Sequence, residues 1–102
     1  AAGIALPSLS FAYKLSGDRV PWRPVRVFDD GRQTFVEFGE RVAAGDMPPL
    51  FILDEKDQAE LVNYRVEGRY IVVDRLFERA ELRLGAGRAA KSVRIKRGRS
   101  AS

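Results

Sequence analysis

The chain has 102 residues, of which 45% are hydrophobic, and this size fits one domain with a single modest core. It has no cysteine and no histidine, so disulfide bonds and thiol chemistry are excluded, and the usual general base and the commonest zinc ligand are missing. No apolar run approaches the roughly 18 residues of a membrane-spanning helix. The first residues lack the charged and long apolar regions of a signal peptide, so a signal for export would lie outside this sequence.

The net charge of +4 is concentrated at the C-terminal end. The last fifteen residues contain no carboxylate and six cations, which leaves residues 1–87 with a net charge of −2; these cations are Arg88, Lys91, Arg94, Lys96, Arg97 and Arg99. Such a cluster can neutralise phosphates or anionic headgroups, although a solvated, partly disordered basic end is the commoner outcome. Because Val93 and Ile95 alternate with cations, a terminal edge strand is a further alternative.

The first elements in chain order are a linker and a strand. Residues 1–10 are mostly small and contain a proline, which is typical of the end of a linker. In residues 11–15 large apolar side chains occupy every second position, and this alternation predicts a strand. Residues 16–18, with their serine, glycine and aspartate, predict the turn that ends it.

A proline-bracketed segment follows. Pro21 and Pro24 flank Trp22. Because proline cannot donate a hydrogen bond to a ladder, this segment is expected at a sheet edge or just before a strand that begins at Val25.

The clearest single element is a β-hairpin. Asp30 and Gly31 lie between two alternating runs, residues 25–28 and 33–38. Asp tolerates a positive φ and Gly prefers it, which is what a tight hairpin turn requires.

The next segment, residues 39–49, is long for a loop in a compact domain and contains two glycines and two adjacent prolines. Function often resides in such loops, so we treat it as a second candidate contact, for example with a neighbouring copy of the chain. A plain mobile connection is the alternative. The residues proposed for this assembly loop are Arg41, Asp46, Met47 and Pro48.

The second half predicts further strands. Residues 50–53 form a continuous apolar run typical of a strand covered on both faces, and the polar residues 54–57 close it without the glycine and final glutamate of a calcium loop. Residues 62–67 and 70–73 predict a second hairpin with Gly68 in its turn.

Residues 74–84 are ambiguous. Their apolar residues would also mark one face of a helix, and these residues are Leu76, Phe77, Ala80 and Leu84. We favour a break near residues 77–79 and a strand over residues 80–84. The expected fold is therefore all-β, a small antiparallel β-sandwich or barrel of about seven to eight short strands with little or no helix. We expect residues 11–97 to form the domain and residues 98–102 to form a basic, flexible tail.

With these segments in order, the chain resembles the C-terminal domain of the VirB9, TrbG and CagX proteins of bacterial type IV secretion and conjugation systems. One such segment alone is weak, but the segments follow the family order and together cover roughly residues 11–97. The segments are residues 22–31, 34–38, 47–51, 62–65 and 72–77 leading into 80–85.

The resemblance implies a periplasmic β-sandwich that is a structural part of the outer-membrane core complex of a Gram-negative bacterium, with no catalytic role, cofactor, metal or small-molecule substrate. In that family this domain binds a VirB7-type lipoprotein and packs beside a VirB10-type subunit, with further copies of itself, in a ring. Full-length members carry a signal peptide and an N-terminal domain, so this chain is expected to be an excised domain, monomeric in isolation. Some members form a disulfide with the lipoprotein, which a chain without cysteine cannot do.

An open sandwich exposes edge strands to which an extended peptide can add. We expect the first strand and the segment around Trp22 to form or flank that edge, because the prolines mark an edge and aromatic residues are favoured at interfaces. The alternative is that these aromatic residues belong to the ordinary core. The candidate partner-binding residues are Phe11, Tyr13, Leu15, Trp22 and Pro24.

Two other function classes compete with an interaction module. A nucleic-acid-binding β-barrel that uses the basic C-terminal tail would need aromatic residues interleaved with cations on one face, whereas here the aromatic residues lie in the near-neutral body. An enzyme fits least well, because the adjacent carboxylates Asp29 and Asp30 would point apart on a turn. Arg65, Glu67, Asp74 and Arg75 are expected to form exposed ion pairs without a function.

Overall fold

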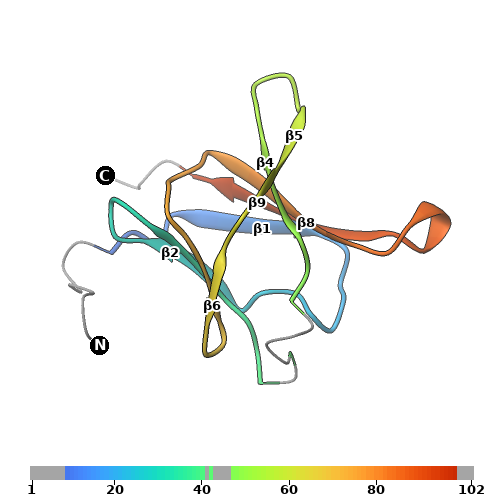
Figure 1. The fold of residues 1–102 in the computed structure, drawn as a ribbon, viewed down its shortest axis with the longest axis horizontal. Helices are drawn as coiled ribbons and strands as arrows, with labels where there is room; N and C mark the ends of the chain where they lie inside the picture. The colour runs from blue at the N-terminus through green and yellow to red at the C-terminus, as the bar shows by residue number, and fades with distance from the viewer. Residues whose placement is uncertain (1–8, 41, 43–46, 99–102) are drawn as a thin grey trace.

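Two antiparallel β-sheets lie face to face in a computed structural model that describes residues 9–40, 42 and 47–98 (Figure 1). One sheet has five strands in the order β1-β9-β8-β4-β5, and the other has four strands in the order β2-β3-β7-β6. The expected all-β sandwich is confirmed, with nine strands in the described part where seven to eight were expected. The elements are β1 (Tyr13–Gly17), β2 (Arg26–Asp29), β3 (Thr34–Glu37), β4 (Leu50–Leu53), β5 (Ala59–Val62), β6 (Arg65–Glu67), β7 (Tyr70–Val73), β8 (Arg79–Leu84), β9 (Lys91–Arg97) and a 3-10 helix, η3 (Gly87–Ala89).

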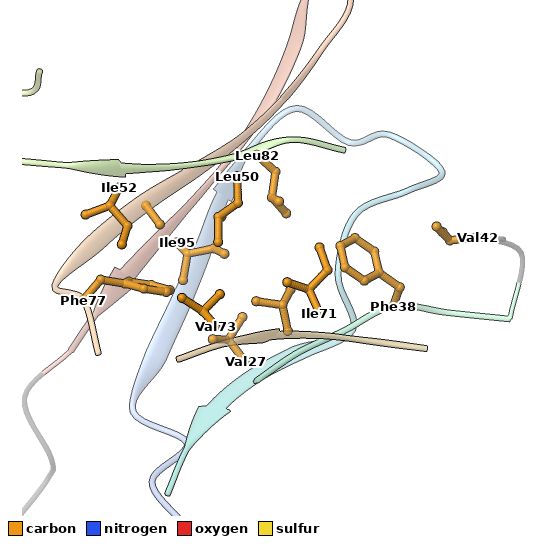
Figure 2. Packing of buried hydrophobic residues seen from close by; sticks show 12 residues of the cluster. Val27, Phe38, Val42, Leu50, Ile52, Ile71, Val73, Phe77, Leu82 and Ile95 are labelled. Atoms are coloured by element: carbon orange, nitrogen blue, oxygen red, sulfur yellow. The ribbon is translucent and has the colours of Figure 1, made fainter. Parts of the chain in front are cut away.

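The core lies between the two sheets and is built from every second residue of their strands (Figure 2). Leu50, Leu82 and Ile95 from the five-stranded sheet and Val36 and Ile71 from the four-stranded sheet are completely buried. Burial of each such side chain stabilises the fold by about 1.5–3 kcal/mol. The apolar residues at every second position of the strands therefore hold the two sheets together.

The hairpin at Asp30 and Gly31 is confirmed, and it joins β2 to β3 through a loop of residues 30–33. Only Gly31, with φ of 90°, uses the left-handed region, and Asp30 does not. The Asp30 carboxylate instead accepts hydrogen bonds from the backbone N–H groups of Gln33 (2.8 Å) and Arg32 (2.9 Å), which lower its pKa. The second hairpin, β6–β7, is also present, with Gly68 and Arg69 in its turn.

The chain changes sheet at both lateral sides of the sandwich. On one side, Ser10 bridges to Asp29 of the four-stranded sheet before β1 joins the five-stranded sheet. On the other side, Val62 pairs with Leu50 in the five-stranded sheet, and Arg65 pairs with Val72 in the four-stranded sheet. The prediction of one strand over residues 62–67 is therefore wrong, because the chain crosses between sheets at residues 63–64.

The C-terminal segment is a seven-residue strand, β9, that lies between β1 and β8. For residues 91–97 the expectation of a solvated end is wrong, and the expected terminal strand is present but does not lie at an edge. Val93 and Ile95 are fully buried and need neighbours on both sides, which an edge position does not provide. Arg99 lies outside the described residues.

Strand β1 also extends beyond its expected end. Ser16 and Gly17, expected in a turn, pair with Arg94 and Val93 of β9. The ambiguous segment after β7 is a strand, β8, that begins at Arg79 after a break, as favoured from the sequence. The polar turn at residues 54–57 is confirmed and closes the hairpin β4–β5, whose second strand was not expected.

The residues expected to form surface ion pairs do so, but Arg75 pairs with a residue that was not expected. Arg65 contacts Asp74 (3.2 Å) and Glu67 (3.6 Å), whereas Arg75 contacts Glu60 (3.8 Å). All of these side chains are at least half exposed, so each pair adds little stability.

Candidate docking edge

Strand β1 lies at the edge of the five-stranded sheet, and the residues proposed for partner binding do not form one exposed surface. Tyr13, Leu15 and Trp22 are partly buried against the main core, and Pro24 is buried. Phe11 is 54% exposed and packs on Phe28 with ring centroids 5.0 Å apart. Phe11 is thus the most accessible of the five, whereas the other four are partly or fully buried.

The backbone of β1 has one side paired and one side open. The Gly98 N–H donates to the Ala12 carbonyl (2.6 Å), and the Asp18 N–H donates to the Ser92 carbonyl (2.9 Å), so even-numbered residues face β9. Because bonding alternates along an antiparallel strand, Tyr13, Leu15 and Gly17 direct their N–H and C=O groups away from the sheet.

Two groups on the open side already have partners. The Tyr13 N–H donates to the Phe11 carbonyl (2.8 Å), and the Arg23 guanidinium donates to the Leu15 carbonyl (3.1 Å). Within the described residues, the Leu15 N–H and both backbone groups of Gly17 have no such partner. The segment that follows β1 therefore covers its edge only in part, through the side chain of Arg23.

A buried polar contact ties this edge to the opposite sheet. Asp29 is 2% exposed and accepts hydrogen bonds from the Tyr13 hydroxyl (2.6 Å) and the Gly31 N–H (2.9 Å), and the Arg97 guanidinium lies 4.0 Å away. Burial raises the pKa of the Tyr13 phenol, and so do its hydrogen bond to Asp29 and the charge of that carboxylate. The hydroxyl therefore stays protonated and donates at neutral pH.

A second apolar cluster covers the outer face of the four-stranded sheet. Phe28 and Phe35 stack with centroids 5.1 Å apart, Val72 lies beside them, and Leu9 and Tyr70 pack against the group. This cluster was not expected from the sequence. Its signal is the consecutive apolar residues in these strands, such as Val27 and Phe28 in β2 or Phe35 and Val36 in β3, because two consecutive buried residues in a strand require cover on both faces.

The candidate assembly loop is described only at its C-terminal end. Arg41 and Asp46 lie outside the described residues. Met47 is partly buried and Pro48 is buried, and both backbone carbonyls accept from the Tyr64 hydroxyl, at 3.2 Å and 2.9 Å. This end of the loop is therefore fixed to the crossing between β5 and β6.

Comparison with known proteins identifies the family. The family model "CagX: Conjugal transfer protein" matches residues 3–98. The chain belongs to the CagX family of conjugal transfer proteins. It is also 36% identical over 96 residues to the "Probable conjugal transfer protein TrbG" of Sinorhizobium fredii (strain NBRC 101917 / NGR234), a match that covers 94% of this chain and 35% of that protein. The resemblance read from the sequence is confirmed, and this CagX-family chain spans about a third of its relative's length.

A cleft of about 940 Å³ lies on this CagX-family domain between the β4–β5 hairpin and residues 75–79. Its arginines face carboxylates, with Arg79 paired to Asp57 and Arg75 to Glu60. Across the described ranges, no group of His, Cys, Asp or Glu is placed to hold a metal ion, and no helix is long and apolar enough to cross a membrane. None of the predicted site residues lines this cleft.

Proposed function

We propose that this domain is a structural subunit of a type IV secretion core complex, in the periplasm at the outer membrane. In this role it binds a VirB7-type lipoprotein along β1 and packs beside a VirB10-type subunit and copies of itself in a ring. Membership of a conjugal transfer family supports the class of machine, and the open edge of β1 supports the mode of binding.

The observation that carries the proposal is the row of outward backbone groups on β1. An added strand would pair with the free N–H of Leu15 and with Gly17, gaining affinity from main-chain hydrogen bonds. The Arg23 guanidinium donates a hydrogen bond to the Leu15 carbonyl (3.1 Å), and this side chain would have to move before an added strand could pair with that carbonyl. Phe11, exposed beside this edge, offers apolar area next to the backbone groups.

The test is a titration of the isotope-labelled domain with a peptide from the small lipoprotein of the same transfer system. We expect amide shifts concentrated in residues 11–24. No perturbation there would eliminate this site. Recovery of that lipoprotein with the domain as bait from a cell envelope tests the wider role, and crosslinking to the VirB10-type subunit tests the ring contact.

A matched pair of peptides tests strand addition itself. Backbone N-methylation at alternate residues removes every donor on one side of an extended peptide. Methylation of the side that faces β1 should abolish binding, whereas methylation of the other side should leave binding intact. Equal binding by both peptides would show that the partner contacts side chains and not the strand edge.

A further inference from the structure

The outer face of β1, β9 and β8 places cations opposite one another. Lys14 pairs in register with Lys96, and Lys96 pairs with Arg79. Leu15 and Ile95 point into the core, so the alternate positions Lys14 and Lys96 point outward, and both are exposed. Part of the positive charge that the sequence places near the C-terminus, that of Arg94 and Lys96, therefore lies on this sheet face.

This arrangement is unfavourable for the domain alone. Like charges directly opposite each other on neighbouring strands destabilise a sheet. Arg79 is compensated by Asp57. Among residues 9–40, 42 and 47–98, no carboxylate lies within 4.0 Å of Lys14 or Lys96. Like charges that face each other without a neighbouring carboxylate are expected at a surface that has a function.

The neighbouring row on the same face adds a second feature. It runs Ser16, Arg94, Glu81, Phe51 and Leu61 across the five strands. Glu81 is held between Arg94 (3.1 Å) and Arg83, and the Arg83 guanidinium lies 4.7 Å from the centre of the Phe51 ring. Leu61 is 62% exposed. A cationic area thus borders a small apolar one.

We propose that this face, with Lys14, Lys96 and Arg94 at its centre, is a docking surface for an acidic segment of a partner protein. Carboxylates of the segment would form ion pairs with Lys14 and Lys96, and an apolar residue of the segment would pack on Phe51 and Leu61. This surface is the face of the sheet and not the edge of β1, so it goes beyond the function proposed above.

The composition of the face favours a polypeptide over a nucleic acid. Single-stranded nucleic acids bind where bases stack on accessible aromatic rings. On the outer positions of β1, β9, β8, β4 and β5, Phe51 is the one aromatic residue, and Arg83 already covers its ring. The exposed ring of Phe11 packs on the other sheet.

The test uses a matched pair of charge reversals in β9. Lys96→Glu inserts an acid between Lys14 and Arg79, whereas Lys91→Glu makes the same change at an exposed position on the opposite side of the strand. The probe is an acidic peptide of about twelve residues with alternating glutamate and threonine. We expect shifts at the amides of Lys14, Arg94 and Lys96, binding weakened about fivefold or more by K96E, and binding changed less than about twofold by K91E.

Thermal unfolding gives a second readout. K96E should raise the unfolding midpoint by about 3 °C because it relieves the repulsion, so weaker binding cannot be attributed to a damaged fold. Equal weakening by both variants would overturn the proposal, since it would show only a net-charge effect. Tighter binding of a thymidine oligonucleotide, or of phosphatidylglycerol vesicles, at the same amides would also overturn it. The N-methylated peptides above report on the edge, so the two proposals can fail separately.

Discussion

The phenol of Tyr13 in β1 donates a 2.6 Å hydrogen bond to the carboxylate of Asp29, which belongs to the opposite sheet and is 2% exposed. A buried carboxylate is costly unless donors surround it, and here the donors come from both sheets. The contact thus fixes the position of the β1 edge relative to the four-stranded sheet.

Tyr13→Phe should lower the free energy of unfolding by about 1–3 kcal/mol, because Asp29 loses a donor while it remains buried. Tyr70→Phe is the matched control, since the Tyr70 ring packs on Phe28 at 6.0 Å and its hydroxyl has no hydrogen-bond partner within the described residues. Denaturant unfolding measures both variants. Equal effects would show that the bond to Asp29 contributes no more than an exposed hydroxyl.

The same contact predicts a loss of stability in alkaline solution. The folded state raises the pKa of Tyr13 through burial and Asp29. An unfolded tyrosine ionises near pH 10, so the stabilisation is complete below about pH 10 and is lost as the pH rises further. The stability gap between the wild type and Tyr13→Phe should therefore narrow above about pH 10. Burial also raises the pKa of Tyr64, but that residue is present in both proteins and cancels. A constant gap up to about pH 11 would contradict the assignment.

Gly17→Ala should be strongly destabilising. Gly17 has φ of 103°, and an added Cβ would lie 2.6 Å from the Ser92 carbonyl oxygen, a backbone atom that cannot move without opening the ladder to β9. We expect a loss of about 3 kcal/mol or more, from steric overlap together with backbone strain. Gly31→Ala is the control, because Gly31 has φ of 90° but nothing lies within 4 Å of its added Cβ. Strain alone should cost it about 1 kcal/mol. Similar losses in the two variants would argue against close approach at Gly17.

Leu82→Ala should reduce the free energy of unfolding by about 2–5 kcal/mol, because Leu82 is completely buried between the sheets. Leu61→Ala makes the same chemical change at a side chain that is 62% exposed, and it should alter stability by less than about 0.5 kcal/mol. Thermal or denaturant unfolding checks both. A large loss for Leu61→Ala would mean that β5 packs differently from the arrangement described here.

The local elements of the fold could be predicted, whereas the pairing between distant strands could not. The hairpin around Gly31 depends on a turn and its flanking alternation, which lie within a few residues of one another. The crossing after Val62 could not be seen, because the alternation of residues 62–67 continues while the chain changes partner from Leu50 to Val72. Likewise, Val93 alternates with cations whether β9 is an edge or an interior strand.

The candidate site was predicted only at the level of the first strand. Alternation identified the segment, and the topology places β1 at an edge. The bond from Arg23 to the Leu15 carbonyl joins residues in different segments, and nothing in their spacing indicates it. The facing of Lys14 and Lys96 depends on the register between β1 and β9, which the sequence does not encode locally. From the sequence alone, Lys96 therefore cannot be distinguished from the other basic residues near the C-terminus.

Two of the places where the chain passes between the sheets, one before β1 and one between β5 and β6, have a mechanical consequence. On one side of the sandwich, the segment that contains Ser10 and β1 pairs with both sheets. On the other side, the segment that contains β5 and β6 does the same. Neither sheet can slide relative to the other unless the hydrogen bonds between one of these segments and a sheet are broken. A force applied at β1 would therefore act on both sheets, and the domain would transmit that force as a rigid body that resists shear.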